Sequence, residues 1–584
     1  MSSGRRIVFT RDATGLVREI SIMDAVVIVA SFIIGGGIMF LSVQSLAPGY
    51  FPGANLSASY VGALFLVLPL ALIYAVLSRA MPRSGGDYIF ISRILGPGLG
   101  FVGSWGTWVG GLLTVGVLAF QAVSFGSLFI MYQGLMTFNF DLMGFAIQLT
   151  DPFWGVVFGI VLVCIFGGVL IASTRFSLWV MRLLLIIPLL GALAAIWVLS
   201  TNSPVNMLFA WNYLFGWGSS EFGAYGDLFT IAYQNYYLSY AVNASTNSLS
   251  DSLGAVIVAI FALTGFSTLS IVGGEVRDTR RVFYVAMVLG LIFIAIFYIA
   301  LLYPLQANYG SFINVYNFLT YSTDQISSLF GLPAVLMWSL PHMGFSWPLS
   351  LVPGWGSLLP YDTLQYWIQY GAWLWAGKTA VPIPASVPLF AAPLSGLSWL
   401  GLFIIGAGIL WMVNSILPIL LTNSRYIFAW SFDRVVPTRI STLNERTTTP
   451  IYAILICMVV ASIGVVLSYS STLQAAINVV FLGVFSVALT VLAGLLFTRR
   501  RPDLAERTYS PRIGRLSVLG ICGVVAAISI VPLIIGALAT FDISSLLTIV
   551  VVYTFGAMIY LLMRRRNRKA GVDLDAIFRS IPPE

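Results

Sequence analysis

The amino-acid sequence predicts an all-α integral membrane protein with about twelve transmembrane helices. Hydrophobic residues make up 59% of its 584 residues, whereas charged residues make up only 9%. Soluble domains carry roughly 25% charged residues, so a water-facing surface cannot be built from this composition. The apolar segments have the length of spanning helices and lack the alternation of barrel strands. Lipid must therefore cover most of the protein.

Apolar segments of sufficient length place the helices in order along the chain. They cover residues 24–46, 59–79, 98–131, 152–172, 178–199, 252–273, 283–306, 396–423, 451–469, 472–497, 516–536 and 543–563. Polar stretches supply the loops, of which 200–251 and 307–395 are long and rich in Ser, Asn, Tyr, Trp, Pro and Gly. These two loops form either a cap over one mouth of the bundle or a loosely ordered surface.

The basic residues orient the helices. Every Lys and Arg except Lys378 lies in one of the two tails or in a loop on the same side as both tails. Cytoplasmic loops carry an excess of Lys and Arg, so we expect a multi-pass protein of the cell membrane with both termini cytoplasmic. The net charge of +8 then indicates attraction to the anionic inner leaflet of the lipid bilayer, not binding of nucleic acid.

Several classes of function fit the sequence poorly. The first 20 residues lack the apolar segment of a signal peptide. The three cysteines lie in apolar segments and the only histidine, His342, lies in a Pro- and Trp-rich loop. We therefore expect no disulfide, no metal site, no cofactor and no catalytic residues, and the protein is not predicted to be an enzyme. The phosphate-binding loop of an ATP-driven pump is also missing from the sequence.

Glycine clusters interrupt two helices at matching positions. Gly35, Gly36 and Gly37 lie near the middle of the first helix, and the stretch from Thr264 to Thr268 lies near the middle of the sixth. Each of these helices opens a block of five. Interrupted helices at equivalent positions of two halves point to the binding site of a transporter. The alternative is that the glycines only permit close helix packing, which is what we expect of Gly106 in the third helix.

Interrupted helices offer backbone groups to a ligand. Exposed N–H groups at a helix N-terminus attract anions, and exposed carbonyls attract cations. One site between two such breaks can hold a carboxylate and an ammonium group together. An α-amino acid presents both groups.

Five segments in order along the chain resemble the amino acid–polyamine–organocation (APC) superfamily of amino acid permeases. They are Ile34–Met39, Met81–Phe101, Phe261–Phe266, Glu275–Arg281 and Ser424–Pro450. The first resembles the family's G-S/A-G-I-F segment, the second its P-R-S-G-G-E-Y loop and the third its F-A-F-T-G-F-E segment. Ser267 stands where many members have Glu, and the two long loops exceed the family norm.

The resemblance implies the leucine-transporter-type fold, which is a five-plus-five inverted repeat, here followed by two C-terminal helices. The corresponding parts are a tail 1–23, a first repeat 24–199, an outer loop 200–251, a second repeat 252–497 that contains the loop 307–395, helices eleven and twelve in 498–563, and a tail 564–584. The protein is thus expected to be a secondary active transporter of amino acids that works by alternating access. The alternative is a transporter of polyamines or other organocations, and a channel, sensor or membrane-bound enzyme fits less well.

The candidate substrate-binding residues lie in the two breaks or one turn away. They are Ser31, Gly35, Gly36, Gly37, Ile38, Phe261, Thr264, Gly265, Phe266 and Ser267. Amides of the first break would bind the carboxylate, and carbonyls from Phe261 to Thr264 would bind the amine. Phe266 is either a gate or a core aromatic residue, and Ser31 either faces the site or bonds its own helix. We expect Gly36 to border open space.

The coupling ion is open between proton and sodium. Carboxylates inside a membrane usually mark proton relays, but the sequence places none at a helix centre. Asn414 and Ser415 in the eighth helix either contribute to a sodium site or form hydrogen bonds that pack the helices.

Overall fold

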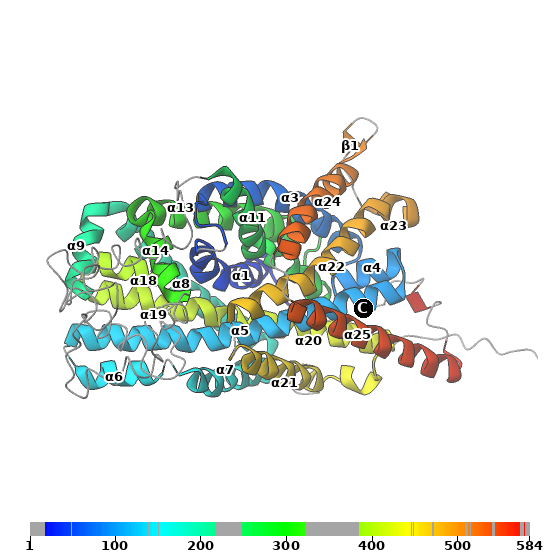
Figure 1. The fold of residues 1–584 in the computed structure, drawn as a ribbon. Coiled ribbons are helices and arrows are strands. Elements are labelled where there is room, and N and C mark those ends of the chain that lie inside the picture. Colours follow the sequence, from blue (N-terminus) through cyan, green and yellow to red (C-terminus); the bar gives the residue numbers. More distant parts are fainter. Residues whose placement is uncertain are drawn as a thin grey trace, which may run out of the picture.

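The computed structural model is an elongated bundle whose long helices lie side by side along one direction (Figure 1). It describes residues 18–47, 50–137, 139–149, 151–215, 248–321, 385–444, 447, 449–469, 472–508, 512–513, 516–539, 543–572 and 577–578. His342 and Lys378, and most of the two long loops, lie outside these described residues.

Helices dominate the described chain. The α-helices are α1 (Ile22–Ile33), α2 (Ser42–Gln44), α3 (Leu56–Ala80), α4 (Asp87–Ile94), α5 (Pro97–Thr137), α6 (Phe140–Gln148), α7 (Pro152–Ala172), α8 (Thr174–Thr201), α9 (Pro204–Phe215), α11 (Leu249–Leu263), α12 (Thr268–Ile271), α13 (Gly290–Tyr309), α14 (Phe312–Tyr321), α18 (Val387–Leu394), α19 (Trp399–Asn414), α20 (Ile416–Phe432), α21 (Ile451–Leu467), α22 (Thr472–Arg500), α23 (Pro502–Arg507), α24 (Val518–Ala539) and α25 (Ile543–Lys569).

Shorter elements join them. Two π-helical segments are η1 (Gly37–Leu41) and η4 (Tyr284–Leu289), and three 3₁₀ segments are η2 (Thr264–Ser267), η3 (Gly273–Glu275) and η6 (Thr438–Ser441). The strands β1 (Arg512–Ile513) and β2 (Leu516–Ser517) pair antiparallel, with Arg512 opposite Ser517.

Ten helical stretches of the described residues are long and apolar enough to cross a membrane. They are Ile22–Gln44, Leu56–Ala80, Pro97–Thr137, Pro152–Ala172, Thr174–Thr201, Leu249–Ile271, Tyr284–Tyr309, Trp399–Phe432, Leu482–Arg500 and Leu547–Lys569. Shorter apolar helices cover Ile451–Leu467 and Leu519–Ile528. Helix is present in every segment where the sequence predicts a span, so the all-α membrane class is confirmed.

Local sequence explains several helix boundaries. Ser21 and Asp24 form a capping box at the start of α1, because each side chain accepts a hydrogen bond from the other's backbone N–H. Asp151 caps α7, whose first residue is Pro152, and a proline is favoured at the first position of a helix. Local chemistry thus fixes where these two helices start.

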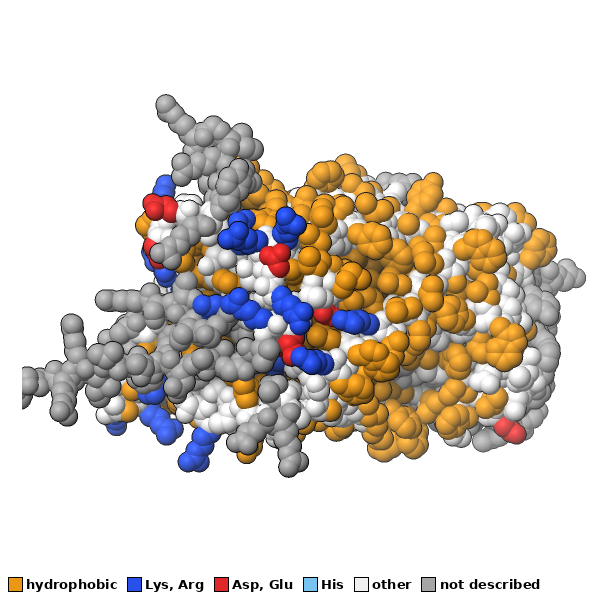
Figure 2. Space-filling view, turned by 180° about the vertical axis from the view of Figure 1, so that it is seen from behind, with side chains coloured by type: hydrophobic (Ala, Val, Ile, Leu, Met, Phe, Trp, Pro, Cys, Tyr) orange, Lys and Arg blue, Asp and Glu red, His pale blue; other side chains and the backbone are white. Residues whose placement is uncertain are grey.

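The buried and exposed helices differ as a membrane protein requires. The stretch from α1 to α2 is almost entirely buried, whereas little of the apolar part of α25 is buried. Large apolar side chains such as Phe65, Trp197 and Phe293 point outward. Figure 2 shows hydrophobic side chains over the middle of the molecule and most charged side chains gathered toward one end. This pattern belongs to a multi-pass membrane protein, whose apolar surface faces lipid.

Contacts between distant segments place the basic loops at that same end. Glu19 binds Arg175 at 2.7 Å, and Ile20 pairs with Val276. The side chain of Asn567, near the end of α25, donates to the Arg434 carbonyl at 2.8 Å. The first described stretch, the end of α25 and three intervening turns therefore share one end. This is the arrangement that the basic residues predict.

The described parts of the two long loops are helical and packed together at the opposite end (Figure 1). Trp211 of α9 packs edge-on against Phe312 of α14, with ring centroids 4.8 Å apart, and stacks on Phe390 of α18 at 6.0 Å. Tyr309 contacts Phe390 at 4.9 Å. Of the two alternatives for the loops, the packed cap fits these described segments.

Candidate functional site

The first break separates α1 from η1. The helix ends at Ile33, and Ile34 leaves the helical conformation with φ −73° and ψ 79°. Gly35 donates to the Ile33 carbonyl at 2.8 Å instead of continuing the helix ladder. Helical structure resumes at Gly37 and runs through α2. The interruption predicted at residues 35–38 is therefore present, centred slightly earlier in the chain.

The second break is a change of helix type. The α-helix ends at Leu263, tightens to a 3₁₀ segment from Thr264 to Ser267, and returns to α-helix at Thr268. The Thr264 hydroxyl donates to the Phe261 carbonyl at 2.8 Å. The interruption predicted at residues 264–268 is thus present as a local tightening.

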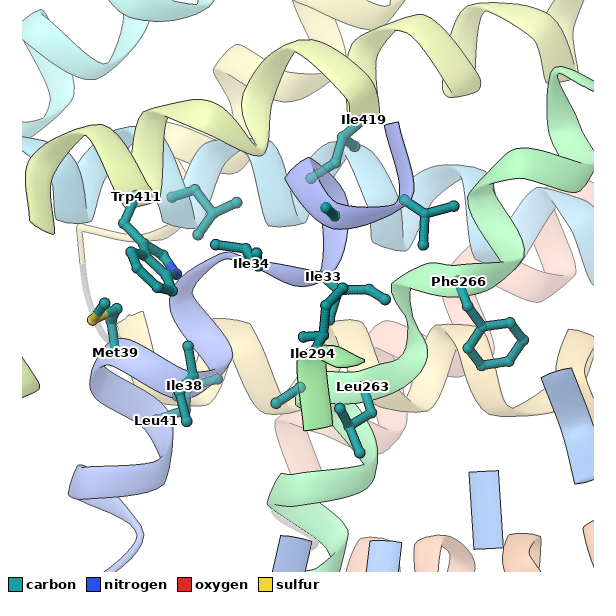
Figure 3. Packing of buried hydrophobic residues seen from close by; sticks show 14 of the residues in the cluster. Ile33, Ile34, Ile38, Met39, Leu41, Leu263, Phe266, Ile294, Trp411 and Ile419 are labelled. Carbon is teal, nitrogen blue, oxygen red and sulfur yellow. The ribbon is translucent and has the colours of Figure 1, made fainter. Parts of the chain in front are cut away.

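The two breaks touch each other at backbone level. A Cβ atom placed on Gly37 would lie 2.9 Å from Cα of Ala262. One placed on Gly265 would lie 2.9 Å from the backbone nitrogen of Ile33. Real Cβ atoms do not come this close to backbone, so only glycine fits at either position. Figure 3 shows the two interrupted helices side by side, with Ile33 between them.

Hydroxyl groups from other helices meet the carbonyls that the first break frees. The Ser415 hydroxyl lies within hydrogen-bond distance of the Ser31 carbonyl, at 2.8 Å, and of the Ile34 carbonyl, at 3.2 Å. Tyr298 of α13 donates to the Ile33 carbonyl at 2.7 Å. Buried carbonyls need such partners, because an unmade hydrogen bond costs about 1–3 kcal/mol.

A third interruption positions Ser415. It lies between α19 and α20, and Pro418 follows three residues later. Proline has no N–H to give to the carbonyl four residues earlier, here that of Asn414, so the helix breaks at this point. The break turns the Ser415 hydroxyl and the Asn414 amide toward Ser31, where the amide nitrogen lies 3.4 Å from the carbonyl oxygen.

Further hydroxyls extend this arrangement on the other side of the break. Ser42 donates to the Gly37 carbonyl at 2.8 Å and lies 2.7 Å from the Tyr60 hydroxyl. The rings of Tyr60 and Tyr298 meet edge-on at 5.6 Å. We call Ser42, Tyr60, Tyr298 and Ser415 the hydroxyl bracket. It holds the backbone on both sides of the first break without using a single charged side chain.

Several buried polar atoms near the bracket have no hydrogen-bond partner among the described residues. They are the Ser31 hydroxyl, Oδ1 of Asn414 and Nε1 of Trp411. All three residues are fully buried. Trp411 stands beside Ile34, Ile38 and Met39 in Figure 3. These atoms are neutral donors and acceptors that lie close to the first break.

The predicted residues divide into two groups. The first group lies at the first break and consists of Ser31, Gly35, Gly37 and Ile38. Gly265 packs against Phe32 and Ile33, which come just before that break. Phe261, Thr264 and Ser267 are partly exposed on the second break. Phe266 is different, because its ring packs edge-on against Tyr74 of α3 at 5.7 Å and points away from Ile34 in Figure 3.

The expectation that Gly36 borders open space is wrong. A Cβ atom there would lie 2.3 Å from the ring of Phe40 and 3.0 Å from the Leu118 side chain. The π-helical turn that follows the break folds Phe40 back over the glycine, and sequence patterns do not predict such a turn. Gly106 packs as expected, since a Cβ there would lie 2.3 Å from the Tyr553 hydroxyl of α25.

Sequence reasoning missed Ser42, Tyr60, Tyr298 and Trp411. The signal available was a polar or amphipathic side chain inside an apolar helix, but many such residues serve only local packing. For Ser415 the sequence left two alternatives, and its hydrogen bonds to the first helix match the packing alternative.

Comparisons with known proteins agree with this architecture. The sequence model of a family described as "Amino acid permease" matches residues 20–345 and 376–558. The chain is 26% identical over 302 residues to the serine/threonine exchanger SteT of Bacillus subtilis (strain 168). The aligned region covers 50% of this chain and 57% of that protein. It is 30% identical over 119 residues to the putative amino-acid transporter MJ1196 of Methanocaldococcus jannaschii, covering 20% of this chain and 32% of that protein. The matches thus span about half and a third of these relatives.

Proposed function

The chain belongs to the amino acid permease family, and we propose that it moves amino acids across the cell membrane as a secondary transporter that works by alternating access. Membership makes it a multi-pass membrane transporter and not an enzyme. The observation that carries the proposal is the direct contact between two interrupted helices that lie far apart in the sequence.

In this proposal the substrate binds at the contact between the two breaks. Amides at the start of η1, from Gly36 to Ile38, bind the carboxylate, because the first N–H groups of a helix have no partner within it. Carbonyls from Phe261 to Thr264 bind the ammonium group. The interruptions of α1 and of α11 support this placement.

The side chains around the breaks favour a substrate with a neutral side chain. The hydroxyl bracket and the unpartnered atoms of Ser31, Trp411 and Asn414 are all neutral. Ser267 at the second break is neutral, whereas a carboxylate in its place would attract a polyamine or other organocation. This observation favours amino acids over the organocation alternative. The exchanger of serine and threonine among the relatives fits the same substrate class.

The proposal includes the arrangement of the chain in the membrane. Residues 24–199 and 252–497 would form the two inverted repeats, each opened by an interrupted helix. The end that gathers the basic side chains would face the cytoplasm, in keeping with the positive-inside rule. The coupling ion is either a proton or sodium.

Purified protein in liposomes tests the function. We expect uptake or exchange of at least one radiolabelled amino acid from a full panel, measured with and without a pH gradient or a sodium gradient. Liposomes without protein and a panel of polyamines are the controls. Transport of polyamines alone would favour the organocation alternative. If folded protein transports neither class, the proposed function is wrong.

A further inference from the structure

Asp87 occupies an unusual position at the charged end of the bundle. It is the first residue of α4 and follows a turn in which Gly85 and Gly86 have φ of 109° and 48°. Those positive φ values and the close approach of Gly86 to Ser270 require glycine, so the turn is fixed. The turn delivers the Asp87 side chain into the protein interior, where it is only 3% exposed.

Its carboxylate binds neutral donors from separate parts of the chain. The Tyr426 hydroxyl of α20 donates to Oδ1, and the Ser486 hydroxyl of α22 donates to Oδ2 at 2.5 Å. The Tyr88 backbone N–H donates to Oδ1 at 2.9 Å. Asp87 therefore joins α4 to α20 and α22 through one side chain.

The other buried carboxylates have charged partners. Among the described residues they are ion-paired to arginines, in the pairs Asp24–Arg182, Glu275–Arg425 and Asp433–Arg93. For Asp87, no Lys or Arg of the described chain lies within ion-pair distance. An ionised carboxylate buried without a counter-ion is costly, so burial raises the pKa of Asp87, and the hydrogen bonds from Ser486 and Tyr426 offset part of that rise.

The remaining groups around Asp87 are also uncharged or already paired. Tyr74 of α3 and Tyr553 of α25 face it. A tyrosine hydroxyl is uncharged at ordinary pH. The neighbouring helix α5 contains no Asp, Glu, Lys or Arg. On α22, Arg500 donates to the Ile94 carbonyl at the far end of α4. Arg425 of α20 and Asp433, the residue after that helix, are held in their own ion pairs.

We propose that Asp87 is a proton-binding site, and that proton binding loosens the junction between α4, α20 and α22. The ionised carboxylate accepts short, charge-assisted hydrogen bonds from two other helices, and such bonds are roughly twice as strong as neutral ones. Protonation turns one oxygen into a donor and removes an acceptor position. The bonds from Tyr426 and Ser486 then weaken, and α4 is freed from the helices on either side.

Proton binding at this junction supplies a coupling mechanism. The role in coupling rests on the proposed transport function, whereas proton binding itself does not. A proton at Asp87 would favour opening of the charged end of the bundle, and its release would favour closing. The proton would then be the coupling ion, bound away from the two breaks.

Infrared difference spectroscopy of the purified protein tests proton binding without any substrate. We expect the band of a protonated carboxylic acid to appear as the pH falls, at a pH where exposed carboxyl groups are still ionised. Asp87→Asn should remove the band, whereas Asp278→Asn, at an exposed carboxyl group, should retain it. A band that persists in folded Asp87→Asn protein would overturn the proposal.

A second variant tests the assignment even if Asp87→Asn does not fold. Ser486→Ala removes one donor to the ionised form, so the midpoint of the band should move upward by about one pH unit or more. An unchanged midpoint would contradict the assignment.

The coupling role has its own measurement. With L-serine and L-threonine as probes in liposomes, a pH gradient should stimulate uptake by the unaltered protein and by Asp278→Asn, but not by Asp87→Asn. Stimulation that survives in Asp87→Asn would overturn coupling through Asp87. If the unaltered protein transports no amino acid, the proposed function fails, while the infrared result still decides proton binding.

Discussion

The hydroxyl bracket at the first break and the charged end of the bundle hold helices together by different means. The bracket uses neutral hydroxyls on backbone carbonyls, as Tyr298 does with Ile33. The charged end uses buried ion pairs between side chains, as Glu275 does with Arg425 at 2.6 Å. A neutral hydrogen bond contributes about 0.5–1.5 kcal/mol, whereas removing one partner of a buried ion pair costs about 3–5 kcal/mol. The break region can therefore rearrange at low cost, and the charged end resists change.

A second ion pair reinforces the contrast. Arg93 binds Asp433 at 2.7 Å with both side chains buried, and Tyr88 donates to the same carboxylate at 2.8 Å. The ring of Phe578, in the last described stretch of the chain, covers Arg93 with its centroid 4.7 Å from the guanidinium carbon. Asp87 is the exception at this end, because it is buried and no Lys or Arg of the described residues lies within ion-pair distance of it. Proton binding can therefore change the charge of Asp87, whereas the ion-paired carboxylates keep their charge.

The largest expected effect comes from the ion pair. Glu275→Gln leaves Arg425 charged and unpaired in a buried position, so the protein should lose about 3–5 kcal/mol of stability. Thermal unfolding in detergent measures the loss. The double variant Glu275→Gln with Arg425→Met should be closer to the unaltered protein, since no charge remains unpaired. Equal stability of Glu275→Gln and the unaltered protein would remove the distinction between the two regions.

A substitution at the contact between the two breaks should have the next largest effect. Gly37→Val places a Cβ atom 2.9 Å from Ala262 Cα, and overpacking of this kind costs about 1–3 kcal/mol. Amino acid uptake should be lost in liposomes even where the protein remains folded. The matched control is Gly126→Ala on α5, where a Cβ meets no atom within 4 Å. Normal uptake by Gly37→Val would place the substrate elsewhere.

A smaller effect is expected within the hydroxyl bracket. Ser415→Ala removes the hydroxyl that serves the Ser31 and Ile34 carbonyls, so stability should fall by about 1 kcal/mol. Ser462→Ala is a suitable control, since its hydroxyl bonds only its own helix at Met458. A Ser415→Ala loss as large as that of Glu275→Gln would mean that the bracket is as rigid as the charged end.

The smallest effect is expected for Phe578. Phe578→Ala removes the ring over Arg93 but leaves the ion pair intact, which should cost about 0.5–1 kcal/mol. Phe578→Trp keeps an aromatic face and should retain the stability. The two variants are compared by thermal unfolding at low and high salt, and a loss shared by both would point to shape and not to the cation–π contact.

The sequence by itself determined the membrane class, the single basic end and the position of both breaks. These features follow from local properties: apolar length, basic residues between helices, and glycine clusters such as Gly35 to Gly37. It also drew attention to Ser31 and Ser415 as polar residues in apolar helices, but left a binding role and a packing role open for each. The sequence was misleading at Gly36, because no simple residue pattern encodes the backbone of a π-helical turn.

Only the tertiary structure decided which side chains meet. Ser415 reaches a carbonyl of Ser31, 384 positions away in the sequence, and Tyr298 reaches Ile33 across 265 positions. Asp87 shows the same limit. Its type and position can be read from the sequence, but the absence of a paired Lys or Arg among the described residues cannot. Whether a buried carboxylate keeps its charge depends on which arginines the packing of distant helices brings near it, and each of the other buried carboxylates received one.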